Sequence, residues 1–188
     1  MFKALIIILL TLKGVLMAIE EPKYTVIEKY EAFEIRKYES FLVAQTEVSG
    51  AFDERGGKAF RILIKYISGE NQKQNNIKMT APVIEESKND SNSAVISFIM
   101  PENFTLDSLP IPIDNRIILK ENSAKNIAVL EYNGGWGEEK YKENEAILLK
   151  ALQDANIKTI GKPNFARYNS PFALWFMRRN EIMIEVQR

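Results

Sequence analysis

The order of strand-like and helix-like patterns recurs once along this chain of 188 residues, and the recurrence limits the possible folds more than any other feature. In each half, at least two stretches with the strand-like alternation of half-buried strands precede a helical stretch, and two more strand-like stretches follow it. The helical stretches cover residues from about 55 to 68 and from 139 to 156. A chance recurrence of strand and helix order is the alternative to a true repeat.

Glycines that precede the two helical stretches align the halves. When Gly50 is placed on Gly134, Phe52 falls on Trp136. The stretches with strand character are 24–28, 33–36, 41–48, 77–84, 94–100, 116–120, 127–132, 164–168 and 182–186. Each half needs the other to bury its sheet. We therefore expect one antiparallel α+β fold built from two strand-strand-helix-strand-strand repeats, with two helices against a curved or barrel-like sheet.

The first eighteen residues have the three-part form of a secretory signal peptide. Lys3 supplies the basic start, residues 4–12 form the apolar centre, and Ala18 is the expected last residue before cleavage. Lys13 interrupts the apolar stretch, so an uncleaved anchor or a buried N-terminal helix is the alternative. The stretch is shorter than the roughly 20 apolar residues of a stable membrane span. We expect a periplasmic or secreted protein with one domain over residues 19–188.

Composition excludes several functional classes. The 25 basic and 25 acidic residues cancel, so the chain lacks the basic surplus of a nucleic-acid-binding protein. It has no Cys and no His, which removes thiolate nucleophiles, His-dependent triads and the usual zinc and iron–sulfur ligands. Adjacent carboxylates such as Glu85-Glu86 and Glu138-Glu139 point in different directions on a strand or a helix. We therefore expect a binding protein rather than an enzyme.

The first helix has more apolar surface than packing on one sheet requires. Its apolar side chains span an arc of roughly 200°, whereas a helix on one sheet needs a stripe of little over 100°. Lys58, Arg61 and Lys65 fill the remaining strip. The extra apolar flank could line a site for a flat apolar ligand, with the basic strip placed for its acidic groups. The alternative is that a loop covers the flank and the basic strip is merely solvated.

Four short sequence motifs are distributed over residues 22–188. They are Phe33–Tyr38, Lys78–Val83, Tyr168–Pro171 and Arg178–Glu181. In order and spacing they resemble the SOUL heme-binding protein family. The resemblance implies a distorted antiparallel β-barrel with two helices, a fold that is also similar to the gyrase-inhibitor-like ligand-binding modules.

The resemblance further implies non-catalytic binding of heme or a related tetrapyrrole in a shallow apolar site beside the first helix. The residues that it indicates are Phe60, Arg61, Ile64 and Lys65 of that helix and Lys37 and Tyr38 of the early strand. Other members carry a second basic residue where this chain has Gly56-Gly57, and a further Lys where it has Leu174.

Iron ligation is where the chain departs from its relatives. Some members have a His where this chain has Lys37. The remaining formal candidates for an axial ligand are Tyr38, Tyr66, Met79, Met100 and Met177. We therefore expect contacts to the macrocycle and its propionates to dominate, with weak or no ligation of iron and no other metal site.

Structural readings of the same motifs stay open. Thr80-Ala81-Pro82 could mark the entry of an edge strand, and Arg178–Glu181 could be a turn with Asn180 in the left-handed conformation and Glu181 paired with an Arg. Two other functions also stay open. The protein could bind another small amphipathic ligand, as the gyrase-inhibitor-like modules do, or it could be an envelope protein-interaction domain.

Overall fold

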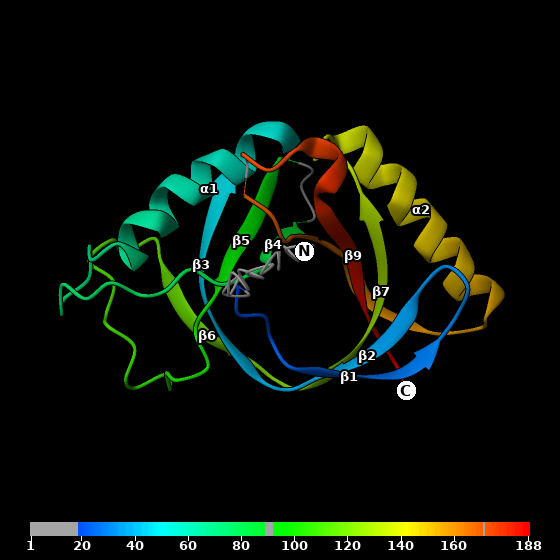
Figure 1. The fold of residues 1–188 in the computed structure, drawn as a ribbon, viewed down its shortest axis with the longest axis horizontal. Helices are drawn as coiled ribbons and strands as arrows, with labels where there is room; N and C mark the ends of the chain where they lie inside the picture. Colours follow the sequence, from blue (N-terminus) through cyan, green and yellow to red (C-terminus); the bar gives the residue numbers. More distant parts are fainter. Residues whose placement is uncertain (1–18, 89–91, 171) are drawn as a thin grey trace, which may run out of the picture.

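A computed structural model of the chain describes residues 19–88, 92–170 and 172–188, so the predicted signal peptide lies outside the described residues. One nine-stranded antiparallel sheet curls into a half-barrel, and two helices lie on its outer face (Figure 1). This is the predicted α+β architecture. The strands are β1 (Tyr24–Lys29), β2 (Glu34–Tyr38), β3 (Phe41–Ser49), β4 (Val83–Ser87), β5 (Ser93–Ile99), β6 (Ile118–Asn122), β7 (Lys125–Asn133), β8 (Thr159–Arg167) and β9 (Arg179–Val186). The helices are α1 (Phe52–Ile67), α2 (Glu138–Asp154) and the short 3₁₀ helix η1 (Trp175–Met177).

The strand order confirms the internal repeat. The sheet runs β1-β2-β7-β9-β8-β4-β5-β3-β6. Apart from β1, exchanging the strands of the two repeats reverses this order onto itself. The first strand of each repeat pairs with the other repeat, because β2 pairs with β7 and β6 pairs with β3. The two units therefore complete each other's sheet.

The aligned glycines have the same backbone conformation. Gly50 has a φ of +139° and Gly134 a φ of +131°, and each comes just before a helix. Residues with a side chain rarely adopt this conformation, so glycine is favoured at both turns. Helix α1 ends just before Gly69. The Gly69 N–H donates to the Tyr66 carbonyl, and the Glu70 N–H donates to the Lys65 carbonyl. This is a Schellman motif, which requires the left-handed residue that glycine supplies.

Each helix covers its own half of the outer face of the sheet. Beneath α1, Ala59 and Leu63 are fully buried in a cluster with Ile96 of β5. Beneath α2, Leu148 is buried in a second cluster with Phe165 of β8. The N-terminal ends of the two helices lie next to each other (Figure 1).

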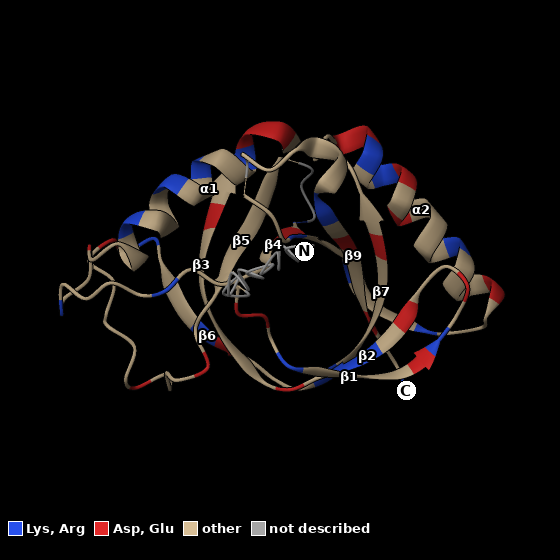
Figure 2. Ribbon diagram, viewed as in Figure 1, with Lys and Arg blue, Asp and Glu red and all other residues tan. Residues whose placement is uncertain are grey.

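Charges of both signs run along α2, whereas α1 is acidic in its first turn and basic beyond it (Figure 2). On α2, Lys142 pairs with Glu138 and Lys150 pairs with Asp154, at one-turn spacing and with exposed side chains. Pairs of this kind contribute about 0.3–0.5 kcal/mol each. These charges keep the outer faces of the helices in water and do not determine the fold.

A third cluster lies on the inner, concave face of the sheet. It comprises Tyr38, Ala81, Val129, Ala166, Tyr168 and Met183. Successive side chains on a strand face opposite sides, so Ala166 points inward while Phe165 points toward α2. The half-barrel is therefore packed on both faces.

Three local readings of the sequence are wrong. The stretch from Ile77 was expected to be a strand, yet β4 begins only at Val83, after a cis peptide bond between Ala81 and Pro82. Strand β4 lies between β8 and β5, so it is not an edge strand. Asn180 lies within β9, where its side-chain amide donates to the Gly134 carbonyl, and not in a turn.

Within the described residues, no helix is long and apolar enough to cross a membrane.

Candidate functional site

A pocket of about 840 Å³ lies beside α1. This volume falls within the range of roughly 300–1,000 Å³ that is typical of small-molecule sites. Three walls enclose it: one flank of α1, the segment that leads into β4, and the segments before α2 and after β8. Ile19 also contributes to the lining.

The α1 wall is a regular helical stripe. Its members are Asp53, Gly56, Gly57, Phe60, Arg61 and Ile64. They recur at spacings of three and four residues, which places them on one face of the helix. The residues that α1 buries against the sheet, such as Ala59 and Leu63, form a neighbouring stripe. The extra apolar flank that the sequence predicted therefore lines a pocket, through Phe60 and Ile64.

The opposite wall comes from the second repeat and from two of the sequence motifs. Trp136 lies just before α2, and 168–170 follow β8. The segment before β4 supplies Met79, Thr80 and Ala81. The Thr80 hydroxyl donates to the Ile99 carbonyl at 2.6 Å, which holds this segment against β5. Motif residues that lie far apart in the sequence therefore meet around one cavity.

A buried charge cluster lies between the pocket and the sheet. Glu85 of β4 forms ion pairs with Arg55 of α1, at 2.9 Å, and with Arg167 of β8. The side chains of Glu85 and Arg55 are 1% and 2% exposed, whereas that of Arg167 is 12% exposed and lines the pocket. A Cβ atom on Gly56 would overlap the Arg167 guanidinium. The absence of a side chain at Gly56 therefore allows Arg167 to lie under α1.

A second buried network lies behind the pocket, on the inner face of the sheet. Glu181 is fully buried and accepts hydrogen bonds from the Tyr168 hydroxyl at 2.6 Å, from Arg36 at 2.9 Å and from Arg179 at 2.9 Å. Burial and the nearby Glu181 carboxylate raise the pKa of Tyr168 far above its usual value. Arg36 also donates to the Tyr38 hydroxyl at 3.2 Å. Because these buried charges hydrogen-bond to one another, the network holds β2, β9 and the end of β8 together behind the pocket.

The structure places the predicted site residues in three different surroundings. Phe60, Arg61 and Ile64 line the pocket. Lys65 is exposed, 3.6 Å from Glu70, and lines a separate shallow hollow on the other flank of α1. Lys37 is exposed on β2, and Tyr38 is 2% exposed in the inner cluster. The pocket therefore brings together the first three residues and none of the last three.

Sequence reasoning missed several lining residues, among them Trp136 and Arg167. The repeat alignment held a signal for Trp136, since its counterpart Phe52 also lines the pocket. No sequence motif indicated Arg167. Its place in the pocket wall depends on the space that Gly56, on a distant segment, leaves for its guanidinium.

The formal iron-ligand candidates are scattered. Met79 lines the pocket, whereas the Tyr66 hydroxyl donates to the Pro110 carbonyl, Met100 is buried in the core beneath α1, and Met177 is exposed on η1. Among the residues that the structure describes, no group of three or more acidic side chains is arranged to hold a metal ion.

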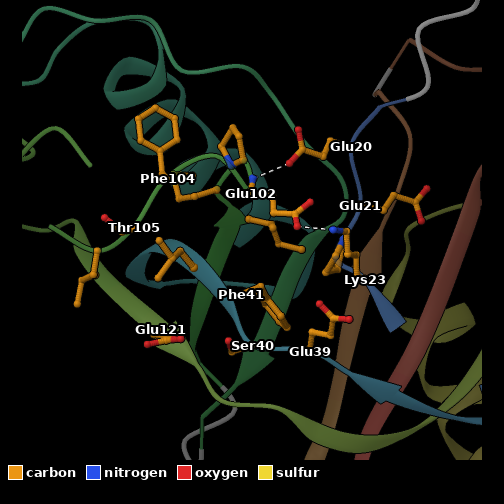
Figure 3. Close-up of a pocket in the computed structure, with 16 residues that line it drawn as sticks. Glu20, Glu21, Lys23, Glu39, Ser40, Phe41, Glu102, Phe104, Thr105 and Glu121 are labelled. Atoms are coloured by element: carbon orange, nitrogen blue, oxygen red, sulfur yellow. Dashed lines mark hydrogen bonds and ion pairs between the residues drawn. The ribbon is translucent and has the colours of Figure 1, made fainter. Parts of the chain in front are cut away.

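A second cavity, of about 350 Å³, lies near the start of the described chain (Figure 3). Its lining includes Glu20, Glu39, Glu102 and Glu121, with Lys23 bound to Glu102. The Glu102 N–H donates to the Glu20 carboxylate at 2.6 Å, which ties this segment to the loop after β5 (Figure 3). An acidic lining repels carboxylates, so this cavity is unsuited to an acidic ligand.

Solved structures share this fold. The C-terminal domain of EcmrR matches with a TM-score of 0.67 at 10% identity, covering 88% of this chain and 98% of that domain. SAV2435, solved bound to tetraphenylphosphonium, matches with a TM-score of 0.51 at 9% identity, covering 82% of this chain and 93% of that one. At these identities the likeness shows the fold alone.

Sequence relatives are more specific. Heme-binding protein 1 of Xenopus laevis is 29% identical over 162 residues, covering 79% of this chain and 85% of the relative. Heme-binding protein 2 of Homo sapiens is 27% identical over 164 residues, covering 80% of each chain. The profile of the SOUL heme-binding protein family matches residues 19–185, which includes nearly all of the described chain. The chain therefore belongs to the SOUL heme-binding protein family.

Proposed function

We propose that this protein binds heme or a related tetrapyrrole, without catalysis, in the pocket beside α1. The observation that carries the proposal is the apolar flank of α1, where Phe60 and Ile64 face a cavity of about 840 Å³ that also has Trp136 and Met79 in its lining. A porphyrin is a large flat apolar ring with acidic groups at one edge. Aromatic and aliphatic walls suit the ring, and Arg61 at the pocket suits the acidic edge.

The same lining supports binding through the macrocycle rather than through iron. A heme iron is usually held by His, Cys, Met or Tyr. The chain has no His or Cys, and the hydroxyl of the pocket residue Tyr168 is engaged by Glu181, which leaves the Met79 thioether as the remaining candidate in the described lining. Burial of the porphyrin ring and contacts to its propionates then supply the affinity.

The carboxylates support a binding role over an enzymatic one. Glu85 is buried between two guanidinium groups, and its neighbour Glu86 is exposed on the other face of β4. A general acid or base must exchange a proton with a substrate within hydrogen-bond reach. Glu85 is engaged in ion pairs on both of its oxygens, so it is unsuited to that role.

A heme titration of the full chain tests the proposal. Ile64→Asp places a charge on the pocket wall, and Ile147→Asp places the same charge on an exposed position of α2. We expect saturable one-to-one binding in the Soret band, weakened more than about tenfold by Ile64→Asp and unchanged by Ile147→Asp, because burying an unpaired charge against an apolar ring is costly. Linear, non-saturable association, or equal effects of the two variants, would refute the site.

We also propose that residues 1–18 direct export to the periplasm or the medium and are removed after Ala18. The family profile begins at residue 19, directly after the predicted cleavage point. N-terminal sequencing of protein from the exported fraction tests this proposal. We expect Ile19 as the first residue, and full-length protein confined to the cytoplasm would contradict it.

A further inference from the structure

The pocket has a cation that the sequence did not indicate. Arg167 ends β8 at the pocket wall, and within the described chain its one ion pair is with Glu85, through Nη2. Its Nη1 lies against the backbone of Gly56, one of the residues that line the pocket. A guanidinium has five N–H donors; the bond to Glu85 uses Nη2, and the buried Nε has no hydrogen-bond partner within the described chain.

Arg167 shares its carboxylate partner with a second cation. Glu85 pairs with Arg55 through one oxygen and with Arg167 through the other. The other charged residues in the described part of the pocket lining are Asp53 and Arg61. Arg61 is exposed, so Arg167 is the more buried of the two cations in this lining.

Because Arg167 is largely buried, its charge interacts more strongly with a nearby anionic group than a surface charge does. Coulomb interactions are weak in water and strengthen as the surroundings become less polar. The Arg167 side chain is only 12% exposed, while those of Lys58 and Lys65 on α1 are 40% and 61% exposed. Glu85 also holds the guanidinium in place, so little conformational entropy is lost when a ligand binds it.

We propose that Arg167 binds a carboxylate of the ligand and makes the pocket selective for anionic flat apolar molecules over neutral or cationic ones. The inference rests on the proposed function, since it names the charge class that the same pocket accepts. Gly56 is the structural requirement for this selectivity, because a side chain there would displace the guanidinium.

Three iron-free probes separate charge from shape. Protoporphyrin IX has two carboxylates, its dimethyl ester has the same ring without charge, and tetraphenylphosphonium is an apolar cation. Titrations of the full chain, followed by fluorescence anisotropy for the two porphyrins and by calorimetry for the cation, measure the affinities. We expect the wild-type protein to bind the diacid at least about tenfold more tightly than the diester, and the cation more weakly still.

Variants assign the preference to one residue. Arg167→Gln should lower the diacid affinity about tenfold and leave the diester affinity within about twofold. Arg188→Gln is the matched control, because Arg188 also pairs with one carboxylate, Glu28, at a position outside the pocket lining. Arg167→Lys should restore part of the preference, and thermal unfolding by circular dichroism shows whether each variant is folded.

The outcomes distinguish the two proposals. Equal binding of diacid and diester by the wild-type protein, with no effect of Arg167→Gln, would overturn this inference and leave the proposed function standing. Failure of both porphyrins to bind saturably would overturn the proposed function and this inference with it. If Arg167→Gln does not fold, the wild-type preference and the Arg167→Lys variant decide the matter, and a wild-type protein that favours the diester would overturn the inference.

Discussion

At the scale of single residues, Glu85 is a carboxylate buried within a cluster of charges. It is buried between Arg55 and Arg167, and it joins α1 to two strands. Removing one member of a buried ion cluster leaves the others without compensation. We expect Glu85→Gln to lower the free energy of unfolding by about 3–5 kcal/mol in urea titrations.

The matched control for this prediction is Glu47→Gln. Glu47 pairs with Lys88 at 2.5 Å, but both side chains are about half exposed. An exposed pair is worth about 0–1 kcal/mol, so the control should change stability by less than about 1 kcal/mol. A loss of similar size in both variants would show that the buried cluster has no special role in stability.

Titration of Tyr38 makes the free energy of unfolding depend on pH in the alkaline range. Burial and the Glu181 carboxylate raise the pKa of Tyr38 to about 12 from its ordinary 10.0. Above pH 10 the unfolded chain therefore binds fewer protons at this residue than the folded one, and stability falls as pH rises. The contribution of Tyr38 to the free energy of unfolding is complete below about pH 10 and is lost as pH rises toward 12.

Tyr38→Phe tests this linkage. The variant cannot titrate at this position, so its loss of stability between pH 9 and pH 11 should be smaller than that of the wild-type protein by about 1 kcal/mol, since one pKa unit corresponds to about 1.4 kcal/mol. Urea unfolding at a series of pH values measures the difference. Parallel curves for the two proteins would contradict the assignment to Tyr38.

Residue positions also predict where a new ligand could reach a bound heme iron. Met79 lines the pocket, whereas Lys37 is exposed on β2. Imidazole is a strong ligand of heme iron. We therefore expect Met79→His to shift the Soret band and tighten heme binding, and Lys37→His to leave both unchanged. The reverse result would place the heme on the β2 side of the sheet.

At the scale of elements, the basic residues along α1 lie in different surroundings. Arg61 lines both the pocket and the other hollow, whereas Lys65, one turn later, lines only the other hollow, together with Arg116. We expect Arg61→Glu to weaken protoporphyrin IX binding at least about fivefold more than Lys65→Glu, because only Arg61 lies in the proposed site. Absorbance titrations of the two variants measure this ratio, and a larger effect of Lys65→Glu would move the acidic edge of the ligand to the other flank.

The helix elements were predictable because their signals are local. Helical periodicity, together with Gly50 and Gly69, located α1 to within a few residues, and its wide apolar arc indicated the pocket wall with Phe60 and Ile64. The segment from Ile77 alternates like a strand, but the Ile77 N–H binds the Ile67 carbonyl at the end of α1 instead of a neighbouring strand. An alternating hydrophobic pattern indicates that one side of a segment is buried, but it does not indicate which strand the segment pairs with.

The far wall of the pocket could not be predicted by local rules. Trp136 and Tyr168 reach it because the two repeats pack against each other, and Arg167 reaches it because Gly56 leaves room. Each depends on a contact between distant segments. The early-strand residue Tyr38, which the family resemblance indicated, lies in the inner network behind the pocket and not in the lining.

At the scale of the whole molecule, the exchanged strands make the two repeats one cooperative unit. Strand β2 of the first repeat pairs with β7 of the second, β6 of the second pairs with β3 of the first, and β4 pairs with β8 at the centre. A fragment with one repeat would expose the hydrogen-bonding edges of these strands and the apolar faces beside them. The pocket is divided in the same way, with α1 on one fragment and Trp136 on the other.

Fragments 19–113 and 114–188 test this unity. The cut follows Ile113, which is 67% exposed, so it severs a connection without opening the core. We expect each fragment alone to show no cooperative unfolding and no saturable porphyrin binding, because neither contains a complete sheet or both pocket walls. Mixing the fragments should restore the circular dichroism of the intact chain and, with it, binding. Cooperative unfolding of either fragment alone would show that a single repeat is an independent folding unit, and porphyrin binding by fragment 19–113 alone would show that α1 and the segment before β4 suffice to form the site.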